Sequence, residues 1–400
     1  MWIESSIAFK FMRQGRTQTA LILVGISVGV SVIVFITALI MGLQSNIVER
    51  TLGTQSHIKV QPPDEKNKVL PMPEGVVGLT LEDKRAQRLR TIINWLEVRD
   101  TLDVLPEIKA VSPVVSGPAF ARRGDVYKSI SIIGIDPIRY EKIIPISKDI
   151  ISGSFRVGAG DVVIGKLLAD DLGLRAGNKL RIEAGLGRSA VVTIAGIFEL
   201  GVRDIDSRFV YLDLKQAQSL LGLYGGVNQI DVTVNEIFKA NAISARIGKL
   251  TGLKAESWME TNAQLMNALS SQSVSTTIIT FFVGLSVALG IASVLAISVT
   301  QRTREIGILR AMGTRRAQML QVFLIQGAIL GLIGSLVGAL LGYVLVWGFN
   351  TFGPKLFYIP LPLGLIPAAM TVATIAGVLS ALAPAWRASR LDPVVAIRYV

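Results

Sequence analysis

Four long runs of uncharged, mainly apolar residues dominate the hydropathy pattern of the chain. They cover residues 20–43 and 276–300 and lie within residues 317–349 and 361–386. Each run reaches the roughly 20 residues that a helix needs to cross a bilayer. None contains Asp, Glu, Lys or Arg, each of which costs about 3 kcal/mol at the membrane centre on insertion scales. The pattern therefore predicts four transmembrane helices.

The first run is too long for the apolar core of a signal peptide, and no small-residue cleavage motif follows it. We expect it to be retained as a membrane helix. Composition agrees with a membrane protein, because half of the residues are hydrophobic and the mean hydropathy is +0.52.

Residues 44–275 lack such apolar runs and have the pattern of a water-exposed domain. Short β-rich segments alternate with turn residues, at 57–62, 109–117, 128–137, 161–166, 179–184, 190–199, 208–213 and 229–234. Helical periodicity is seen at 81–105, 166–174 and 237–250. This alternation predicts a mixed α+β domain of one or two subdomains, inserted after the first membrane helix. The order of its strands cannot be read from the sequence.

The net charge of +12 is concentrated beside the apolar runs. Residues 44–275 hold 29 Lys and Arg against 26 Asp and Glu, so they account for only +3 of the total. Apart from Lys355, the remaining Lys and Arg lie in short flanks, at Lys10, Arg13, Arg16, Arg302, Arg304, Arg310, Arg315, Arg316, Arg387, Arg390 and Arg398. This is the positive-inside distribution, which marks those flanks as cytoplasmic and argues against nucleic acid as the partner.

The charge pattern gives a complete topology with both termini in the cytoplasm. An amphipathic cytoplasmic helix (1–19) precedes the first span (20–43), and the extracytoplasmic domain (44–275) precedes the second span (276–300). The remaining parts are a cytoplasmic loop (301–316), the third span (317–349), a short outer loop (350–360), the fourth span (361–386) and a cytoplasmic tail (387–400).

The cytoplasmic loop has the pattern of a short helix, "REIGILRAMGTRRAQML". Ile306, Leu309 and Met312 are expected to form an apolar stripe. Gly313 fits the residue after a helix C-terminus, and Thr314 fits the N-cap of the next helix. Such a helix either anchors the chain to phospholipid headgroups or docks a cytosolic partner.

Glycines recur at four-residue spacing in the third span. Two rows are present, Gly327–Gly331–Ser335 and Gly334–Gly338–Gly342, and a shorter one, Gly25–Gly29, lies in the first span. Small residues in such rows allow helix backbones to approach closely. We expect these rows to be packing faces, either within the bundle or toward a second subunit.

Motifs for catalysis are lacking in the sequence. There is no Cys, His57 is the only His, and no G-x-x-x-x-G-K-[ST] phosphate loop occurs. "GLGRSA" from Gly185 is expected to be a hairpin turn, and the acids at 170–171, 204 and 206 to be solvated turns or helix caps. Spans without ionisable groups also disfavour an ion-coupled carrier.

The segment "QRTREIGILRAMGTRRAQMLQVFLIQGAILGLIGSLVGALLGYVL" resembles the core of the FtsX/MacB-type permease family of ABC transporters. "PAWRASRLDPVVAIRYV", "GDVVIGKLLADDLGLRAGNKLRI", "SIIGIDP" and the one-plus-three order of spans are similar to the same family. The resemblance implies a dimeric permease served by cytosolic ATPase subunits, which hold the ATP and Mg²⁺, with no enzyme activity in this chain. It also implies that the 301–313 loop is a coupling helix, with the ATPase-coupling role at Arg304, Glu305, Gly307, Arg310 and Gly313.

The N-terminal segment, with its "GTQSHIKV" start to the outer domain, resembles the Lol-type lipoprotein-releasing permeases of the bacterial inner membrane. That branch implies lipoprotein cargo and a second permease copy or paralogue as partner. The alternatives are MacB-like efflux of small hydrophobic molecules with a periplasmic adaptor, FtsX-like signalling to a cell-wall hydrolase, and a membrane receptor without an ATPase.

Overall fold

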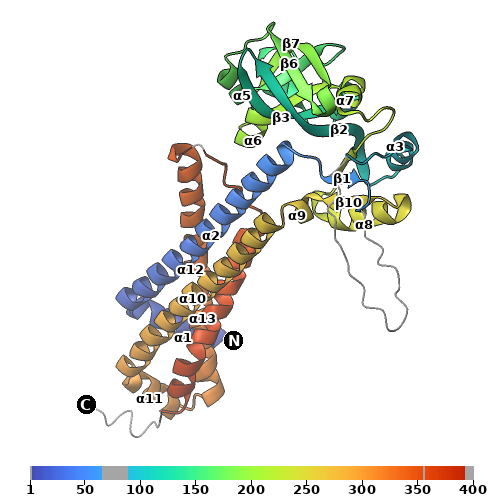
Figure 1. The fold of residues 1–400 in the computed structure, drawn as a ribbon. Helices are drawn as coiled ribbons and strands as arrows, with labels where there is room; N and C mark the ends of the chain where they lie inside the picture. The colour runs from blue at the N-terminus through green and yellow to red at the C-terminus, as the bar shows by residue number, and fades with distance from the viewer. Residues whose placement is uncertain (1, 65–88, 355, 392–400) are drawn as a thin grey trace, which may run out of the picture. The chain divides into compact units, whose positions relative to one another are not determined.

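The computed structural model describes residues 2–64, 89–354 and 356–391, and these residues form two compact units. The helical unit contains residues up to Val48 and from Asn267 onward, and the sheet unit contains Glu49–Met266. Figure 1 shows the helices and strands of both units. Most of the 387–400 tail predicted above lies outside the described residues.

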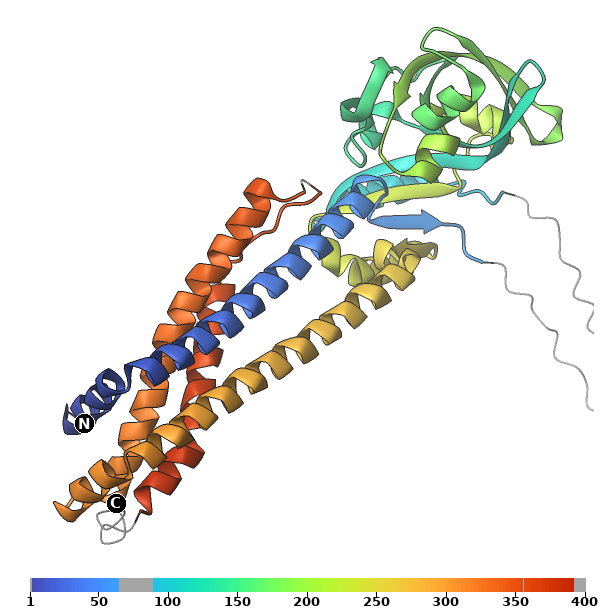
Figure 2. The same ribbon diagram turned by 90° about the vertical axis from the view of Figure 1, so that its left-hand side faces the viewer.

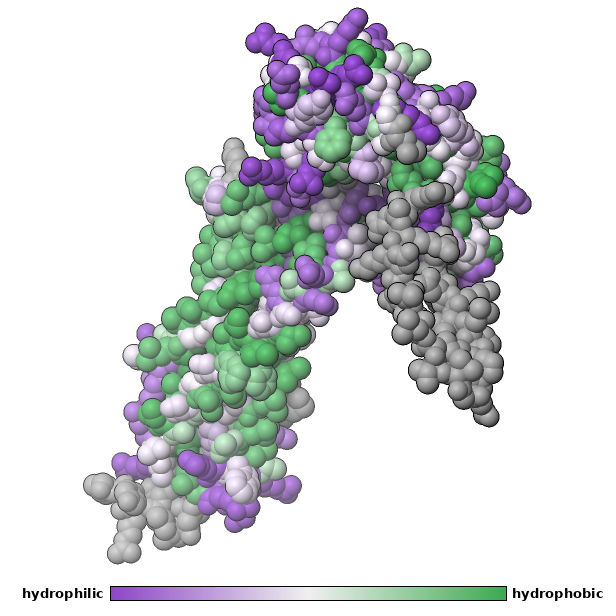
Figure 3. All heavy atoms as spheres, in the orientation of Figure 1, coloured by the Kyte–Doolittle hydropathy of each residue, from purple (hydrophilic) through white to green (hydrophobic). Residues whose placement is uncertain are grey.

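The helical unit is built from long helices that run side by side (Figure 2). Its elements are α1 (Trp2–Gln14), α2 (Arg16–Gly53), α10 (Ala263–Gln301), α11 (Thr303–Ala311), α12 (Arg316–Phe352) and α13 (Leu365–Ser389). Among the described residues, α2, α10, α12 and α13 are the helices long and apolar enough to cross a membrane. Apolar side chains cover their middle stretches, and polar residues gather near α11 (Figure 3).

Glycines allow α12 to pack against two neighbours at once. Gly327 and Gly331 face α13: a Cβ atom on Gly327 would lie 2.6 Å from the carbonyl oxygen of Gly377. Gly334, Gly338 and Gly342 face α2, and a Cβ atom on Gly338 would lie 2.6 Å from the carbonyl oxygen of Ser27. The Ser27 hydroxyl donates a hydrogen bond to the carbonyl oxygen of Gly334 (3.0 Å). Both glycine rows therefore pack against helices of the same chain.

The shorter row in α2 is used only in part. A Cβ atom on Gly29 would lie 2.3 Å from a methyl group of Val287 in α10, whereas nothing lies within 4 Å of the same position on Gly25. Ser335 is fully buried, and its hydroxyl donates back to the carbonyl oxygen of Leu332 (2.9 Å). The close approach at Gly29 brings α10 against α2.

The sheet unit contains a ten-stranded sheet in its described residues. The strands are β1 (Ile58–Gln61), β2 (Ile108–Arg123), β3 (Val126–Ile135), β4 (Ile150–Gly153), β5 (Asp161–Gly165), β6 (Lys179–Ala184), β7 (Ser189–Phe198), β8 (Phe209–Asp213), β9 (Gln229–Val234) and β10 (Lys254–Ser257). The helices are α3 (Trp95–Asp103), α4 (Pro137–Tyr140), α5 (Lys166–Leu172), α6 (Arg203–Arg208), α7 (Leu214–Leu221), α8 (Ala240–Thr251) and α9 (Trp258–Thr261).

Strand β2 joins two parts of this sheet. Its first half pairs with β9, which continues to β1 and β10. Its second half pairs with β3 and β6, and the order β2-β3-β8-β5-β7-β6 returns to β2, so these six strands close into a ring. Closure removes exposed sheet edges, and beside β3, β5, β7 and β8 lies an apolar core that includes Tyr140, Phe198 and Tyr211.

Most predicted strands are present, and the β6–β7 hairpin turns at Gly185–Gly187, as the glycine-rich segment indicated. The long helix predicted at 81–105 is wrong in its described part. Helix α3 begins only at Trp95, because Ile92 is buried in a β-bridge with Val227. The sequence also did not predict β4, β10 or α7.

Candidate functional site

Helix α11 lies between two membrane helices, and local backbone chemistry sets its end. Gly313 adopts φ +99°, a conformation that glycine tolerates. The N–H of Gly313 donates to the carbonyl oxygen of Arg310 (3.1 Å), and that of Thr314 donates to the carbonyl oxygen of Leu309 (3.2 Å). These two bonds make a Schellman motif, so Gly313 ends the helix as its pattern predicted.

The predicted N-cap at Thr314 is wrong. The cap of α12 is Arg315, whose N–H donates to the side-chain oxygen of Gln318 (3.0 Å). Thr314 lies one residue earlier, in the turn, where its N–H closes the preceding helix. The turn between α11 and α12 is therefore one residue longer than expected.

One face of α11 is buried in the helical unit. Ile306 is fully buried in an apolar cluster with Phe11 of α1, Phe323 of α12 and Ala388 of α13. Gly307 is buried beside it. The cluster joins α11 to α1, α10, α12 and α13, so a displacement of α11 must move or break these contacts.

Arg310 also lies on the inner face. Its Nη1 donates to the carbonyl oxygens of Ser389 (2.8 Å) and Leu391 (2.7 Å) at the end of α13. Charge-assisted bonds of this kind are worth roughly 1.5–3 kcal/mol each. Arg310 therefore fastens α11 to the C-terminus of α13, whose last carbonyls have no partner within their own helix.

The opposite face of α11 is exposed. Arg304 and Glu305 lie on it, together with Ile308 (43% exposed) and Met312 (79% exposed). Met312 was expected in the buried stripe, and this prediction is wrong. Because a step of three residues turns the helix by about 300° rather than a full circle, the position drifts by about 60° each time. Met312 thus lies about 120° from Ile306, whereas Arg310 stays close to it.

The five residues for which the resemblance implied ATPase coupling fall into three groups in the structure. Arg304 and Glu305 point away from the helical unit, Gly307 and Arg310 bind it, and Gly313 ends the helix. Sequence reasoning missed Ile308 and Met312, two exposed apolar side chains between charged ones. The signal that could have found them is the spacing 304, 305, 308, 312, which keeps one helix face.

A second feature concerns how the chain enters and leaves the sheet unit. The strand that follows α2, β1, pairs antiparallel with β10, the strand that precedes α9 and α10 (Ile58 opposite Ser257). The N–H of Trp258 donates to the carbonyl oxygen of His57 (2.8 Å), and Nε1 of the buried Trp258 donates to that of Ile237 (2.9 Å). The segments leading to α2 and α10 are thereby tied to each other.

The remaining ionisable candidates have structural roles. Nδ1 of His57 accepts from the N–H of Val234 (3.1 Å), and burial lowers the pKa of His57. Asp206 was expected to be a solvated turn residue or a helix cap; it is buried, and it accepts from the N–H groups of Leu200 (2.9 Å) and Gly201 (3.0 Å). Within the described residues no cluster of His, Asp and Glu could hold a metal ion.

Burial raises the pKa of Asp231 in β9. Its carboxylate accepts from the Ser56 hydroxyl (2.9 Å) and from the Gln229 amide (2.7 Å). Ser56 lies in the segment between α2 and β1, so this buried carboxyl holds that segment against the sheet.

Four helices long and apolar enough to cross a membrane, together with a separate folded sheet unit, indicate a multi-pass membrane protein. The model of the MacB-like periplasmic core domain matches residues 19–250, and that of the FtsX-like permease C-terminal domain matches residues 262–393. The chain therefore belongs to the FtsX/MacB-type family of ABC transporter permeases.

Curated relatives include LolC and MacB proteins. The lipoprotein-releasing system transmembrane protein LolC of Xylella fastidiosa is 25% identical, over 94% of this chain and 92% of its own length. LolC of Neisseria meningitidis is 23% identical over 99% of both chains. The macrolide export ATP-binding/permease protein MacB of a Shewanella species is 27% identical over 99% of this chain but only 61% of its own length.

Proposed function

We propose that this chain is the transmembrane subunit of an inner-membrane lipoprotein-releasing transporter and that a cytosolic ATPase drives it through α11. The single observation that supports the coupling step is the two-sided structure of α11. Its outer face offers Arg304, Glu305, Ile308 and Met312 to a partner, while its inner face is fixed to the helical unit by Ile306 and Arg310.

In this proposal, the ATPase closes on ATP and moves α11, and α10 shifts with it because only Arg302 separates the two helices. The sheet unit responds because its entering and leaving segments are paired through β1 and β10. No channel is required, which is consistent with spans that carry no charged residue. In this proposal α11 lies on the cytoplasmic side of the membrane, and the sheet unit lies outside.

Lipoprotein cargo is favoured by the extent of the likeness. The chain matches 92% and 99% of the lengths of two LolC proteins and 61% of the MacB protein. In the proposal, ATP and Mg²⁺ are bound by a separate subunit, and a second permease copy or paralogue lies beside this chain. MacB-like export remains the second candidate.

The test is co-expression of the chain with its neighbouring genes, followed by purification in mild detergent and mass spectrometry. A stoichiometric ATPase with acylated lipoproteins is the expected result. An ATPase with a periplasmic adaptor and no lipoprotein would replace the cargo assignment with export. Absence of any ATPase would remove the coupling role of α11.

The coupling face is tested separately with the double variant R304A/E305A and with M312E. Both should reduce ATP-driven release and ATPase co-purification. Burying Met312 against a partner is worth about 1.5–3 kcal/mol, so a charge there should weaken docking at least tenfold. The matched control is K239A/E236A, which removes an exposed Lys–Glu pair (2.8 Å) on the sheet unit. Equal activity in R304A/E305A and the control would refute the assignment.

A further inference from the structure

Arg302, between α10 and α11, is a buried cation that forms no ion pair within the described part of the chain. Its side chain is only 9% exposed, and its Nη1 has no hydrogen-bond partner among the described residues. The guanidinium carbon lies 4.8 Å from the centre of the Phe11 ring, a cation–π contact. Burial lowers the pKa of Arg302, and the exposed Glu305 only partly offsets this effect through space.

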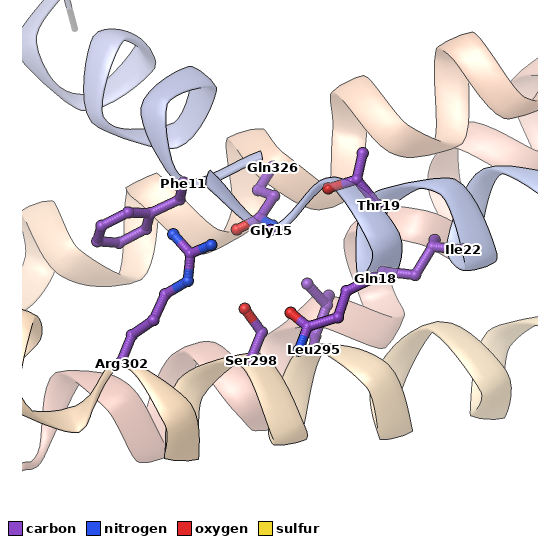
Figure 4. Close-up of a pocket in the computed structure, with 9 residues that line it drawn as sticks. All are labelled: Phe11, Gly15, Gln18, Thr19, Ile22, Leu295, Ser298, Arg302 and Gln326. Atoms are coloured by element: carbon purple, nitrogen blue, oxygen red, sulfur yellow. The ribbon is translucent and has the colours of Figure 1, made fainter. Parts of the chain in front are cut away.

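A small cavity lies directly beside this guanidinium. Side chains from α2, α10 and α12 line it together with Arg302 (Figure 4): Gln18, Thr19, Ser298 and Gln326. Gln326 is 4% exposed, and its Oε1 also lacks a partner among the described residues. A Cβ atom on Gly15 would lie 2.8 Å from Nη2 of Arg302, so this glycine leaves space for the guanidinium.

The cavity is polar and about the size of one water molecule. A water could bridge Nη1 of Arg302 and Oε1 of Gln326, but a neutral molecule would leave the buried charge without an anion. Burying an uncompensated charge is costly, and buried cations are usually paired. One oxygen atom of an anion satisfies both the size of the cavity and the charge of Arg302.

The position of Arg302 suggests which anion this is. It follows the uncharged stretch 276–300 directly, and it contacts Phe11 of α1, the helix that also carries Lys10 and Arg13. Basic residues at this depth meet the phosphate groups of phospholipids. The Gln18 amide donates to the Gln301 side-chain oxygen beside the cavity, and this exposed bond links α2 to α10 at its mouth.

We propose that this cavity is a phosphate-binding site in which Arg302 and the surrounding polar side chains hold one oxygen of a phosphate group. The group belongs to a phospholipid headgroup or to free phosphate. The site ties α1, α2 and α10 together at the base of α11, and its occupancy does not depend on which cargo the transporter carries.

The test uses the full chain in an uncharged detergent and follows its thermal unfolding. Four compounds are titrated: short-chain phosphatidylglycerol, short-chain phosphatidylethanolamine, inorganic phosphate, and a diacylglycerol of the same chain length that lacks the phosphate. We expect the phospholipids to raise the unfolding temperature and the diacylglycerol to have no effect. Stabilisation by inorganic phosphate instead would identify a soluble anion as the source.

Three variants make the result specific. R302Q should weaken phosphate-lipid binding about tenfold or more, because it removes a charge-assisted contact. R304Q is the control, since it removes the same charge from an exposed position two residues away. S298V keeps Arg302 but fills the cavity, and it should abolish the stabilisation even if R302Q does not fold.

Two results would overturn the proposal. The first is the absence of stabilisation by any phosphate compound in the wild-type chain, which would leave a bridging water as the occupant. The second is equal loss of binding in R302Q and R304Q, which would mean that lipid is attracted by general surface charge.

Discussion

Replacing Gly338 by alanine tests whether the close approach of α12 and α2 holds the helical unit together. The new Cβ atom would lie 2.6 Å from the carbonyl oxygen of Ser27 and 2.8 Å from Cβ of Val30. Both distances are far below normal contact, and the nearer one is to backbone, so α2 must move away.

The cost can be worked from these contacts. Overpacking of a well-packed core costs about 1–3 kcal/mol. Separating the helices also strains the Ser27–Gly334 hydrogen bond (3.0 Å), which is worth roughly 0.6 kcal/mol in a membrane bundle. Alanine regains about 0.5–1 kcal/mol of helix propensity. The net loss is about 1–3 kcal/mol, or roughly 5 °C in unfolding temperature for a unit of this size.

Gly348 in the same helix supplies the control. Nothing lies within 4 Å of a Cβ atom at that position, so G348A should gain only the propensity term and unfold at an equal or slightly higher temperature. The assay is intrinsic tryptophan fluorescence during heating, in one detergent for all proteins. If G338A unfolds at the same temperature as G348A, α12 and α2 are not in contact as described.

The remaining predictions concern the two units separately. R310Q should lose the bonds to the carbonyl oxygens of Ser389 and Leu391. The helical unit should then be less stable by about 2 kcal/mol, and hydrogen exchange at the end of α13 should be faster. The control R387Q, at an exposed position, should change neither the stability nor the exchange. Burial raises the pKa of Asp231 above 3.8 in the folded sheet unit, so the folded state favours the protonated carboxyl. The contribution of Asp231 to the free energy of unfolding is therefore largest below about pH 3.8, and it is lost as the pH rises through the raised pKa. D231N should abolish this pH dependence, as measured by hydrogen exchange of the β9 amides between pH 4 and about pH 8, and an unchanged dependence would exclude Asp231 as its source.

Much of this fold could be predicted from hydropathy and turn chemistry alone. The four membrane helices were recognisable because charge is excluded over spans of bilayer length, and Gly313 was recognisable because few residues adopt its backbone conformation. Most strands showed clear β-rich runs. Strand β10 did not, since "KAES" is short and polar and is ordered by pairing with β1, a contact between distant residues.

The candidate site was predictable only in outline. A glycine row shows that a helix has a close-packing face, but not which neighbour meets it, and here adjacent rows meet different helices. In α11, sequence spacing could not reveal that Arg310 turns inward to the end of α13. That orientation depends on unsatisfied carbonyls 79 residues further along the chain.

The pairing of β1 with β10 has an evolutionary consequence. Because the first and last strands of the sheet unit are neighbours in register, the points where the chain enters and leaves this unit are adjacent. A domain with adjacent ends can be exchanged for another between the same two helices without a connecting segment to bridge a gap. The helical unit and the sheet unit can thus diversify independently of each other.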